Sequence, residues 1–319
     1  MCDFLRTFSH CHTDEMPVSR SAPRILAFSD NVVDCYRDQQ LMFPGGNCVN
    51  HAVFAKRFGA QTAYAGAVSD DAAGRAIRDA LVAEGVETPL LRHLPGQTAY
   101  CVIATQGGER NFVGANLGVS IIAPSPADLA WMKTADAVHT GRSSHVDAWL
   151  AHFASLTRVS YDFATIRAED RIASLAPYSF LAGFSGGDLS RDEARDIAGM
   201  ALRHGAKWAV ITRGGNGALL AGPDGVFEAP AVSVQPVDTL GAGDTFIART
   251  LVGLLRGETP EIILMAAAEA AAQTCLSPGA FGYGVPMAVD LSCMLTIDQI
   301  YATTRPVIGP EAASAMTTV

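Results

Sequence analysis

Charged residues are scarce in this sequence of 319 residues: they make up 17% of it, while hydrophobic residues make up 49%. Typical soluble domains carry about 25% charged residues. Such a chain can bury a large core, which excludes disorder throughout. Basic residues are fewer than acidic ones: 23 Lys and Arg against 32 Asp and Glu give a net charge of −9. Without a basic run longer than two residues, neither nucleic acid nor an anionic membrane is expected as a partner.

Long hydrophobic runs are also missing. No apolar stretch has the roughly 18 residues of a membrane span, and residues 1–22 contain no apolar core of a secretory signal. The seven cysteines include no CxxC pair and are odd in number, which favours free thiols in a reducing compartment. We therefore expect a cytoplasmic protein with a mobile leader over residues 1–22. His10, Cys11 and His12 are adjacent and lack further ligands nearby, so we interpret them as part of that leader and assign no metal site.

Strand-length apolar segments alternate with segments of helical period from residue 24 onward. The expected strands are 24–30, 61–69, 135–139, 158–163, 178–183 and 207–212, and the expected helices are 46–59, 70–84, 126–134, 146–154, 168–176 and 190–204. Ser69 is the expected N-cap of the second helix, which ends at Gly85. Repeated βαβ units predict an α/β fold with a doubly wound, mostly parallel sheet and helices on both faces.

Two stretches break this alternation, 32–44 and 97–114. The second is typical of two strands around a turn at Gln106, Gly107 and Gly108. Together they predict a small antiparallel β lid that stands off the main sheet. Its apolar face, formed by Tyr100, Val102 and Ala104, needs cover from a ligand or a partner subunit, so we expect a homodimer through the lid strands.

The strongest local motif runs from Asp238 to Phe246 (DTLGAGDTF) and leads into a helical pattern. Small residues at Gly241, Ala242 and Gly243 let backbone amides at a helix N-terminus face open space, where the helix dipole favours an anion. Asp244 lies in the same turn and is placed to accept a proton from a hydroxyl beside that anion site. A glycine-rich turn with an ordinary first-turn aspartate would also explain the motif.

Two further segments support a ligand site. Residues 212–217 (TRGGNG) follow a buried strand, as a nucleotide-contacting loop does, although a simple hairpin turn fits equally well. Gly45, Gly46 and Asn47 with Asn50 open a helix whose amides face the strand end that carries Asp30, Asn31 and Asp34. Carboxylates and amides together suit a polyhydroxylated ligand. Capping and turn chemistry is the alternative.

Taken together, these segments resemble the PfkB-type (ribokinase-like) carbohydrate kinase family over residues 24–285. The family's two signatures occur in order, the glycine pair with Asn50 that continues to residues 65–74, and the motif 238–244. The resemblance implies a kinase domain over 23–285 and an extension over 286–319. It also implies that Asp244 is the catalytic base, that Gly241, Ala242 and Gly243 form the anion hole, that Thr212, Gly214, Gly217 and Thr239 bind ATP, and that Asp30, Asn31, Asp34, Gly45, Gly46 and Asn50 bind the sugar.

Within the family, several details are similar to the fructoselysine 6-kinase branch. They are residues 30–36, 45–50, 138–139 with His145, 162–163 and 279–284. This similarity implies phosphorylation of the C6 hydroxyl of a ketosamine, with His139 and Asp162 as further substrate-binding residues and with Asp30 and Asp162 attracting the amine arm. His139 could equally be a packing residue at a strand end.

Three alternatives stay open. A ribokinase or fructokinase is one, and a nucleoside kinase is another, because Tyr36, Phe43, Tyr100 and Phe112 could supply an aromatic stacking pair. The third is a pseudokinase that binds sugar or nucleotide without turnover.

Two departures from the family pattern bear on the cofactors, which the resemblance gives as ATP and Mg²⁺ while leaving a monovalent cation open. The usual glycine before the first acidic residue is replaced in Phe28-Ser29-Asp30. The usual Asn-x-x-Glu element, through which metal and phosphate are organised, is missing from residues 181–188. Asp188 or Glu193 could replace it through water.

Overall fold

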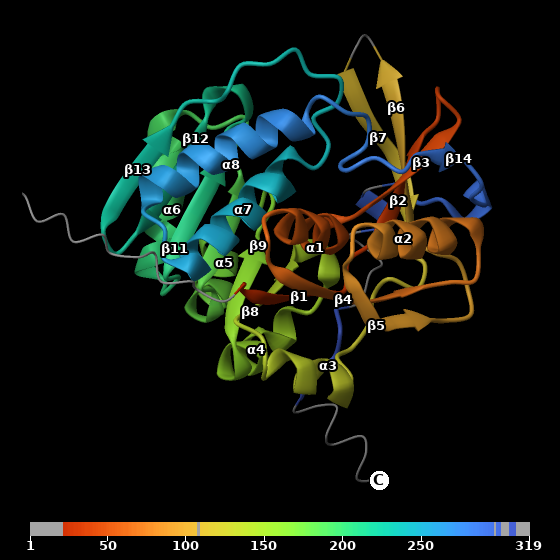
Figure 1. The fold of residues 1–319 in the computed structure, drawn as a ribbon, viewed down its shortest axis with the longest axis horizontal. Helices are drawn as coiled ribbons and strands as arrows, with labels where there is room; N and C mark the ends of the chain where they lie inside the picture. The colour runs from red at the N-terminus through yellow and green to blue at the C-terminus, as the bar shows by residue number, and fades with distance from the viewer. Residues whose placement is uncertain (1–21, 107–108, 297, 301–305, 311–319) are drawn as a thin grey trace, which may run out of the picture.

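A nine-stranded sheet forms the centre of the computed structural model, which describes residues 22–106, 109–296, 298–300 and 306–310 (Figure 1). Its strand order is β13-β12-β11-β10-β9-β8-β1-β4-β5. The strands are β1 (Arg24–Phe28), β4 (Gln61–Val68), β5 (Glu87–His93), β8 (Ala137–Gly141), β9 (Arg158–Asp162), β10 (Leu181–Ser185), β11 (Trp208–Thr212), β12 (Ala218–Gly222) and β13 (Gly225–Ala229). From β5 to β11 every pair is parallel, and β12 and β13 are antiparallel. The predicted doubly wound α/β fold is confirmed.

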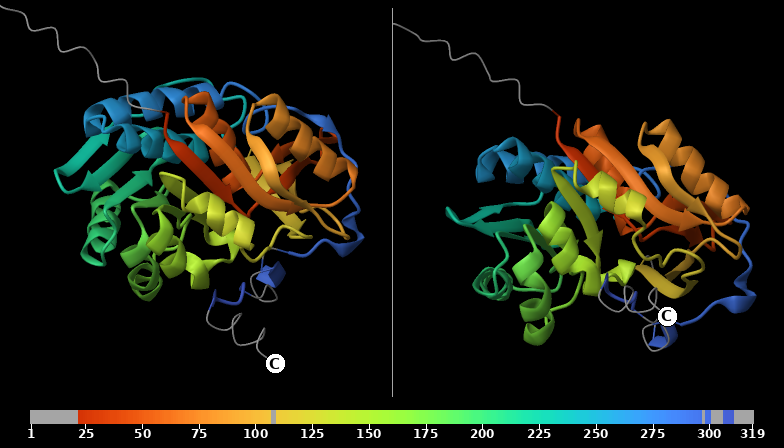
Figure 2. Two further views of the ribbon diagram at one scale, coloured as in Figure 1. Left: turned by 60° about the horizontal axis from the view of Figure 1, so that its bottom comes forward. Right: turned by 90° about the horizontal axis from the view of Figure 1, so that it is seen from below.

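Helices cover both faces of this sheet (Figure 2). One face carries α1 (Asn47–Arg57), α2 (Ala72–Ala83), α7 (Ala242–Arg256) and α8 (Pro260–Thr274); the other carries α3 (Pro126–Met132), α4 (Leu150–Leu156), α5 (Glu169–Leu175) and α6 (Arg191–Arg203). Short 3₁₀ turns occur at η1 (Arg142–Ser144), η2 (Asp147–Trp149), η3 (Ala176–Tyr178), η4 (Gly214–Asn216) and η5 (Leu291–Cys293). Each face buries its own hydrophobic cluster.

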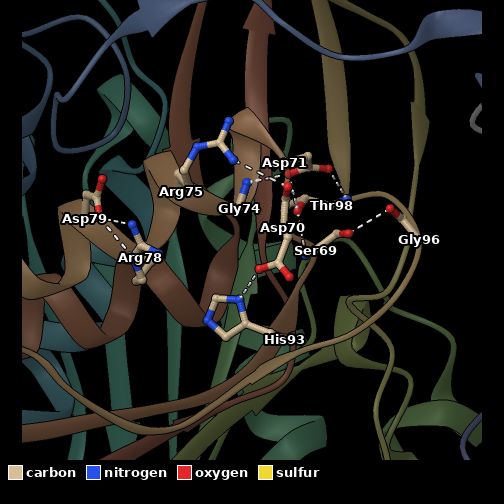
Figure 3. A network of polar contacts seen from close by, with 10 residues as sticks. All are labelled: Ser69, Asp70, Asp71, Gly74, Arg75, Arg78, Asp79, His93, Gly96 and Thr98. Atoms are coloured by element: carbon tan, nitrogen blue, oxygen red, sulfur yellow. Dashed lines mark hydrogen bonds and ion pairs between the residues drawn. The ribbon is translucent and has the colours of Figure 1, made fainter.

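The start of α2 differs from the prediction that Ser69 is its N-cap. Asp71 is the N-cap, and its carboxylate accepts the Gly74 amide at 2.7 Å. The Ser69 hydroxyl instead donates to the Gly96 carbonyl at 2.7 Å, while Asp71 also accepts the amide and hydroxyl of Thr98 at 2.8 and 2.7 Å (Figure 3). One carboxylate therefore caps the helix and fixes the segment that leads into the lid.

A second sheet of five strands forms the lid, at the upper right of Figure 1. Its order is β14 (Val285–Pro286), β3 (Leu41–Gly45), β2 (Val32–Tyr36), β6 (Tyr100–Gln106) and β7 (Glu109–Asn116). All neighbours are antiparallel except β2 and β6, which run parallel. The predicted small lid is confirmed, with β14 as an addition from the far end of the chain.

The chain itself covers the lid face for which we expected a ligand or a partner subunit. Tyr100, Val102 and Ala104 are all buried within one chain, and Tyr100 and Val102 belong to a cluster against which Met287 and Met294 pack. The C-terminal segment reaches the lid through β14 and a bridge between Ala115 and Leu295. That argument for a homodimer is therefore wrong, and the homodimer itself stays a prediction.

The predicted boundary between residues 285 and 286 falls inside β14 and also stays a prediction. Residues 1–21, with the His10, Cys11 and His12 triplet, lie outside the described residues. Within the described part of the chain, no helix is long and apolar enough to cross a membrane, and no cysteine forms a disulfide.

Candidate active site

Five polar side chains from distant parts of the chain meet at the carboxyl ends of the parallel strands. The Asn47 side-chain amide, at the first residue of α1, donates to Asp162 Oδ2 at 2.9 Å and to Asp244 Oδ1 at 3.0 Å. The Asn50 amide, one turn further along, donates to Asp244 Oδ2 at 2.6 Å. The Asn47 backbone amide donates to Asp30 Oδ2 at 2.6 Å. The predicted residues Asp30, Asn50, Asp162 and Asp244 therefore form one cluster.

Burial changes the protonation of these carboxylates. It is the largest cause that raises the pKa of Asp244 to about 6, against the lowering effect of the Asn50 and Asn47 amides. Burial and the Asp244 charge raise the pKa of Asp162 to about 7. The pKa of Asp30 is likewise raised by burial, to about 6. A carboxylate with a pKa near neutrality is a better proton acceptor than an exposed aspartate, so Asp244 is suited to act as a general base.

Asp34 and the glycine pair lie beside this cluster, on the lid side. A Cβ added to Gly45 would stand 2.2 Å from Asp34 Oδ2 and 3.8 Å from Asn50 Oδ1. The absence of a side chain at Gly45 therefore allows both side chains to approach its backbone. Gly46 has φ +95°, and an added Cβ would stand 2.7 Å from the Asn31 Cα. Asn50 Oδ1 is buried without a hydrogen-bond partner among the described atoms. A ligand hydroxyl donating to it would remove that unfavourable state.

The Asn31 side chain has a different setting from the other predicted sugar-binding residues. Its amide donates to Tyr64 Oη at 2.8 Å and to the Ala67 carbonyl at 2.9 Å, which ties the segment after β1 to β4. Ser29 stands where the family usually has glycine, and its φ of +85° shows that the backbone still needs the left-handed region there. Its hydroxyl donates to the Ser120 carbonyl at 3.1 Å.

His139 lies behind Asn47, wholly buried in the middle of β8. Its Nε2 is 3.0 Å from Asn47 Oδ1 and its Nδ1 is 2.9 Å from the Ser160 hydroxyl. Its ring stacks on His51 with centroids 3.6 Å apart. Both ring nitrogens therefore have protein partners, and the prediction that His139 contacts the substrate gains no support from this geometry.

The N-terminus of α7 borders the same cluster. Gly241 is its N-cap with φ +77°, and a Cβ there would stand 2.5 Å from the Ala280 Cβ. The first amides of a helix have no partner within the helix, and they carry its partial positive charge. A Cβ added to Gly243 would have Thr212 Oγ1 as its nearest neighbour at 4.0 Å, and one added to Gly214 would meet nothing within 4 Å. The lack of close atoms at Gly243 and Gly214 leaves the N-terminus of α7 open on this side, as an anion-binding helix N-terminus requires.

Two other residues predicted to bind the nucleotide, Gly217 and Thr239, have structural roles in the loop 213–217 and in the loop before α7. Residues 213–217 join the antiparallel strands β11 and β12, so the hairpin alternative describes the backbone correctly. A Cβ on Gly217 would stand 2.2 Å from the Ala229 carbonyl, so Gly217 is required by packing. The Thr239 carbonyl accepts the Ala242 amide at 3.4 Å.

Asp238 ties the loop before α7 to the lid. Its carboxylate accepts hydrogen bonds from the Tyr36 hydroxyl on β2, from the Gly279 amide and from the Leu240 amide. Tyr36 packs edge-on against Phe43. Tyr36 therefore serves as an anchor, which weakens the hypothesis that it stacks on a nucleoside base.

Both proposed replacements for the missing Asn-x-x-Glu element already have partners. Asp188 accepts two hydrogen bonds from the Arg167 guanidinium, at 2.5 and 2.7 Å. Glu193 accepts the Ser190 amide at 2.8 Å in the capping box of α6. In the described residues no group of three or more His, Cys, Asp or Glu side chains could hold a metal ion. Magnesium stays a prediction, and this ion commonly enters on nucleotide phosphates.

Asn47 is the site residue that the sequence pattern did not identify. The pattern groups Asn47 with the glycine pair as one of the amides that open a helix. Its position as the first helical residue after Gly46 was the available signal, since side chains there point toward a strand end.

A doubly wound α/β fold with a glycine-rich helix N-terminus and a carboxylate in the first turn of that helix is typical of small-molecule kinases. The chain matches the pfkB family carbohydrate kinase model over residues 19–165 and 178–285, and it belongs to that family. It is 38% identical over 268 residues to the fructosamine kinase FrlD of Bacillus subtilis strain 168, covering 82% of this chain and 94% of that protein.

A second relative, the fructoselysine 6-kinase of Escherichia coli strain K12, is 30% identical over 250 residues, covering 77% of this chain and 95% of that protein. Among solved structures, Arabidopsis thaliana ribokinase complexed with ribose and ATP superposes with a TM-score of 0.70 at 20% identity, over 82% of this chain and 95% of that one. That likeness supports the ribokinase-like fold.

Proposed function

We propose that this carbohydrate kinase transfers the γ-phosphoryl group of ATP to the C6 hydroxyl of a ketosamine such as fructoselysine. The observation that carries the proposal is Asp244, which Asn47 and Asn50 hold at the N-terminus of α7. The identity to a fructosamine kinase and a fructoselysine 6-kinase supports the acceptor class.

In this proposal Asp244 accepts the proton of the attacking hydroxyl, and the α7 amides stabilise the charge on the transferring group. Asp34 and the unpartnered Asn50 Oδ1 hold the sugar. Bound ATP supplies the phosphoryl group and its magnesium ion neutralises phosphate charge. Thr212, Gly214, Gly217 and Thr239 shape the loops along the nucleotide. A monovalent cation stays a prediction.

The position of Asp162 changes its proposed role. Asp162 and Asp244 accept hydrogen bonds from the same Asn47 amide, so Asp162 lies at the end of the site where transfer occurs. The amine of a ketosamine is on C1, at the other end of the sugar from C6. We therefore propose that Asp162 acts on transfer to every acceptor, and that recognition of the amine arm depends on groups nearer the lid.

The acceptor is tested by comparing kcat/KM for fructoselysine, fructose, ribose and adenosine with saturating ATP. We expect fructoselysine to exceed each of the others by about tenfold or more, since a pocket built for polar groups rejects an analogue that lacks them. A tenfold lead of ribose or adenosine would overturn the ketosamine proposal and leave the kinase assignment intact. Absence of ADP release with all four acceptors would favour the pseudokinase alternative.

Arg167 is the residue that we propose as a nucleotide contact near the missing element. Its guanidinium donates to the Ser185 carbonyl at 2.9 Å, and the next residue, Gly186, donates to the Thr212 carbonyl at 2.7 Å. Thr212 in turn faces Gly243 at the anion site. An arginine at this place can contribute positive charge that a metal-organising element would otherwise supply.

For Arg167→Ala we expect KM for ATP to rise about tenfold, the loss typical of one charge-assisted hydrogen bond, while KM for the sugar changes little. Asp188→Asn is the matched control, because it breaks the same ion pair and leaves the cation in place. Equal changes in KM for ATP in both variants would show that the pair only ties two loops together. Initial-rate kinetics with varied ATP decide the matter.

A further inference from the structure

Asn47 joins the carboxylates of Asp162 and Asp244 to two buried polar side chains, His139 and Ser160. The chain runs from Ser160 on β9 through His139 on β8 to Asn47, and from there to Asp162 and Asp244. We infer that Asn47 is a positioning residue for phosphoryl transfer, and that His139 and Ser160 orient its amide so that it holds Asp162 and Asp244 together. This inference rests on the proposed role of Asp244 as the base.

The hydrogen-bond inventory fixes every direction in this chain. Above its pKa of about 6, Asp244 is ionised and can only accept, so Asn47 must turn its NH₂ group toward Asp244 and Asp162 and its Oδ1 toward His139. Oδ1 can only accept, so His139 Nε2 must carry the proton and Nδ1 must be bare. The Ser160 hydroxyl then donates to Nδ1. A reversed amide would face two carboxylates with its oxygen, which is unfavourable in a buried site.

The histidine stays neutral in this arrangement. His139 and Ser160 are wholly buried, and burial together with the neighbouring His51 lowers the pKa of His139 well below its usual value. His51 is also buried, which lowers its own pKa to about 3. The chain therefore transmits orientation rather than charge to Asn47. Its effect should appear wherever the Asn47 amide acts, which is on the two carboxylates.

The groups that face Asp244 come from several elements. Asn47 and Asn50 on α1 donate to it, while Asp162 at the end of β9 and Asp30 after β1 bring negative charge. Of these, the Asn47 amide is the group that touches both Asp162 and Asp244. Its loss removes a donor from the base and exposes the base to the second carboxylate. Both changes make Asp244 harder to ionise.

The experiment measures the pH dependence of kcat for variants of the chain. In Asn47→Ala we expect kcat at neutral pH to fall about tenfold. The acidic limb of the profile of kcat against pH should move to higher pH by about one unit. His139→Leu should move the limb in the same direction by a smaller amount. His139→Gln should restore most of the wild-type profile, because its amide can still donate to Asn47 Oδ1. Thr140→Val, at the next buried position of β8, is the control and should leave the limb in place.

A double variant separates positioning from general damage. If His139 acts through Asn47, His139→Leu should cause no further shift of the limb in the Asn47→Ala background. Additive shifts, or an unmoved limb in Asn47→Ala, would overturn the inference. If His139→Leu does not fold, Ser160→Ala replaces it, with Ser160→Thr as the rescue. If Asp244→Asn keeps its activity, the proposed function fails. If Asp244→Asn loses its activity but the acidic limb of the Asn47→Ala profile does not move, only this inference fails.

Discussion

Asp244→Asn is expected to lower kcat by about 10²–10⁴, the usual contribution of a positioned general base. The aspartate and asparagine side chains have nearly the same shape, so the site should keep its packing and KM for ATP should change little. The asparagine cannot accept the hydroxyl proton. Its side chain also has a single oxygen to receive the hydrogen bonds that Asn47 and Asn50 now give to two carboxylate oxygens.

The measurement is steady-state turnover with the best acceptor, together with thermal unfolding to show that the variant is folded. In the wild-type chain kcat should rise with pH through about 6, because a base works in its ionised form and burial raises the pKa of Asp244 to about 6. That limb should vanish from the residual activity of Asp244→Asn. Activity within threefold of wild type would contradict the assignment of Asp244.

Gly45→Ala is expected to lower kcat/KM for the sugar by about 10², since displacing a substrate-holding group by about 1 Å can cost that much. The added Cβ would stand 2.2 Å from Asp34 Oδ2, so the carboxylate has to move. Asp34 is nearly wholly buried, with 4% of its surface exposed, which leaves it little room. KM for ATP should be unchanged, because the nucleotide loops lie elsewhere.

Gly199→Ala on α6 is the matched control for this substitution. Its added Cβ would meet only the end of the flexible Arg203 side chain, at 3.2 Å. We expect it to leave both KM values within about twofold of wild type and to raise stability slightly, as alanine does in a helix. Gly45→Ala with unchanged sugar kinetics would show that Asp34 does not hold the acceptor.

The sequence by itself determined the order of the parallel strands except β5, the helices from α1 to α7, the lid and the glycine-rich turn before α7, whereas α8 was not predicted. These features follow from local patterns. Apolar periodicity distinguishes strand from helix, and small residues before a helical pattern leave backbone amides open. The pattern did not predict β5 or β13, in which no residue is fully buried, because edge strands lack a continuous apolar run. It also omitted β12, whose five residues end in glycine.

The tertiary structure alone decided how the site residues act on one another. Asn47 meets Asp162 and Asp244 across 115 and 197 positions of the chain. Which strand ends become neighbours depends on the crossovers of the whole sheet, and side-chain direction at a strand end follows from local packing. The sequence therefore predicted that His139 and Asp162 contact the substrate, whereas the fold buries His139 behind Asn47 and sets Asp162 beside Asp244. For the same reason the C-terminal segment, far from the lid in sequence, supplies its cover.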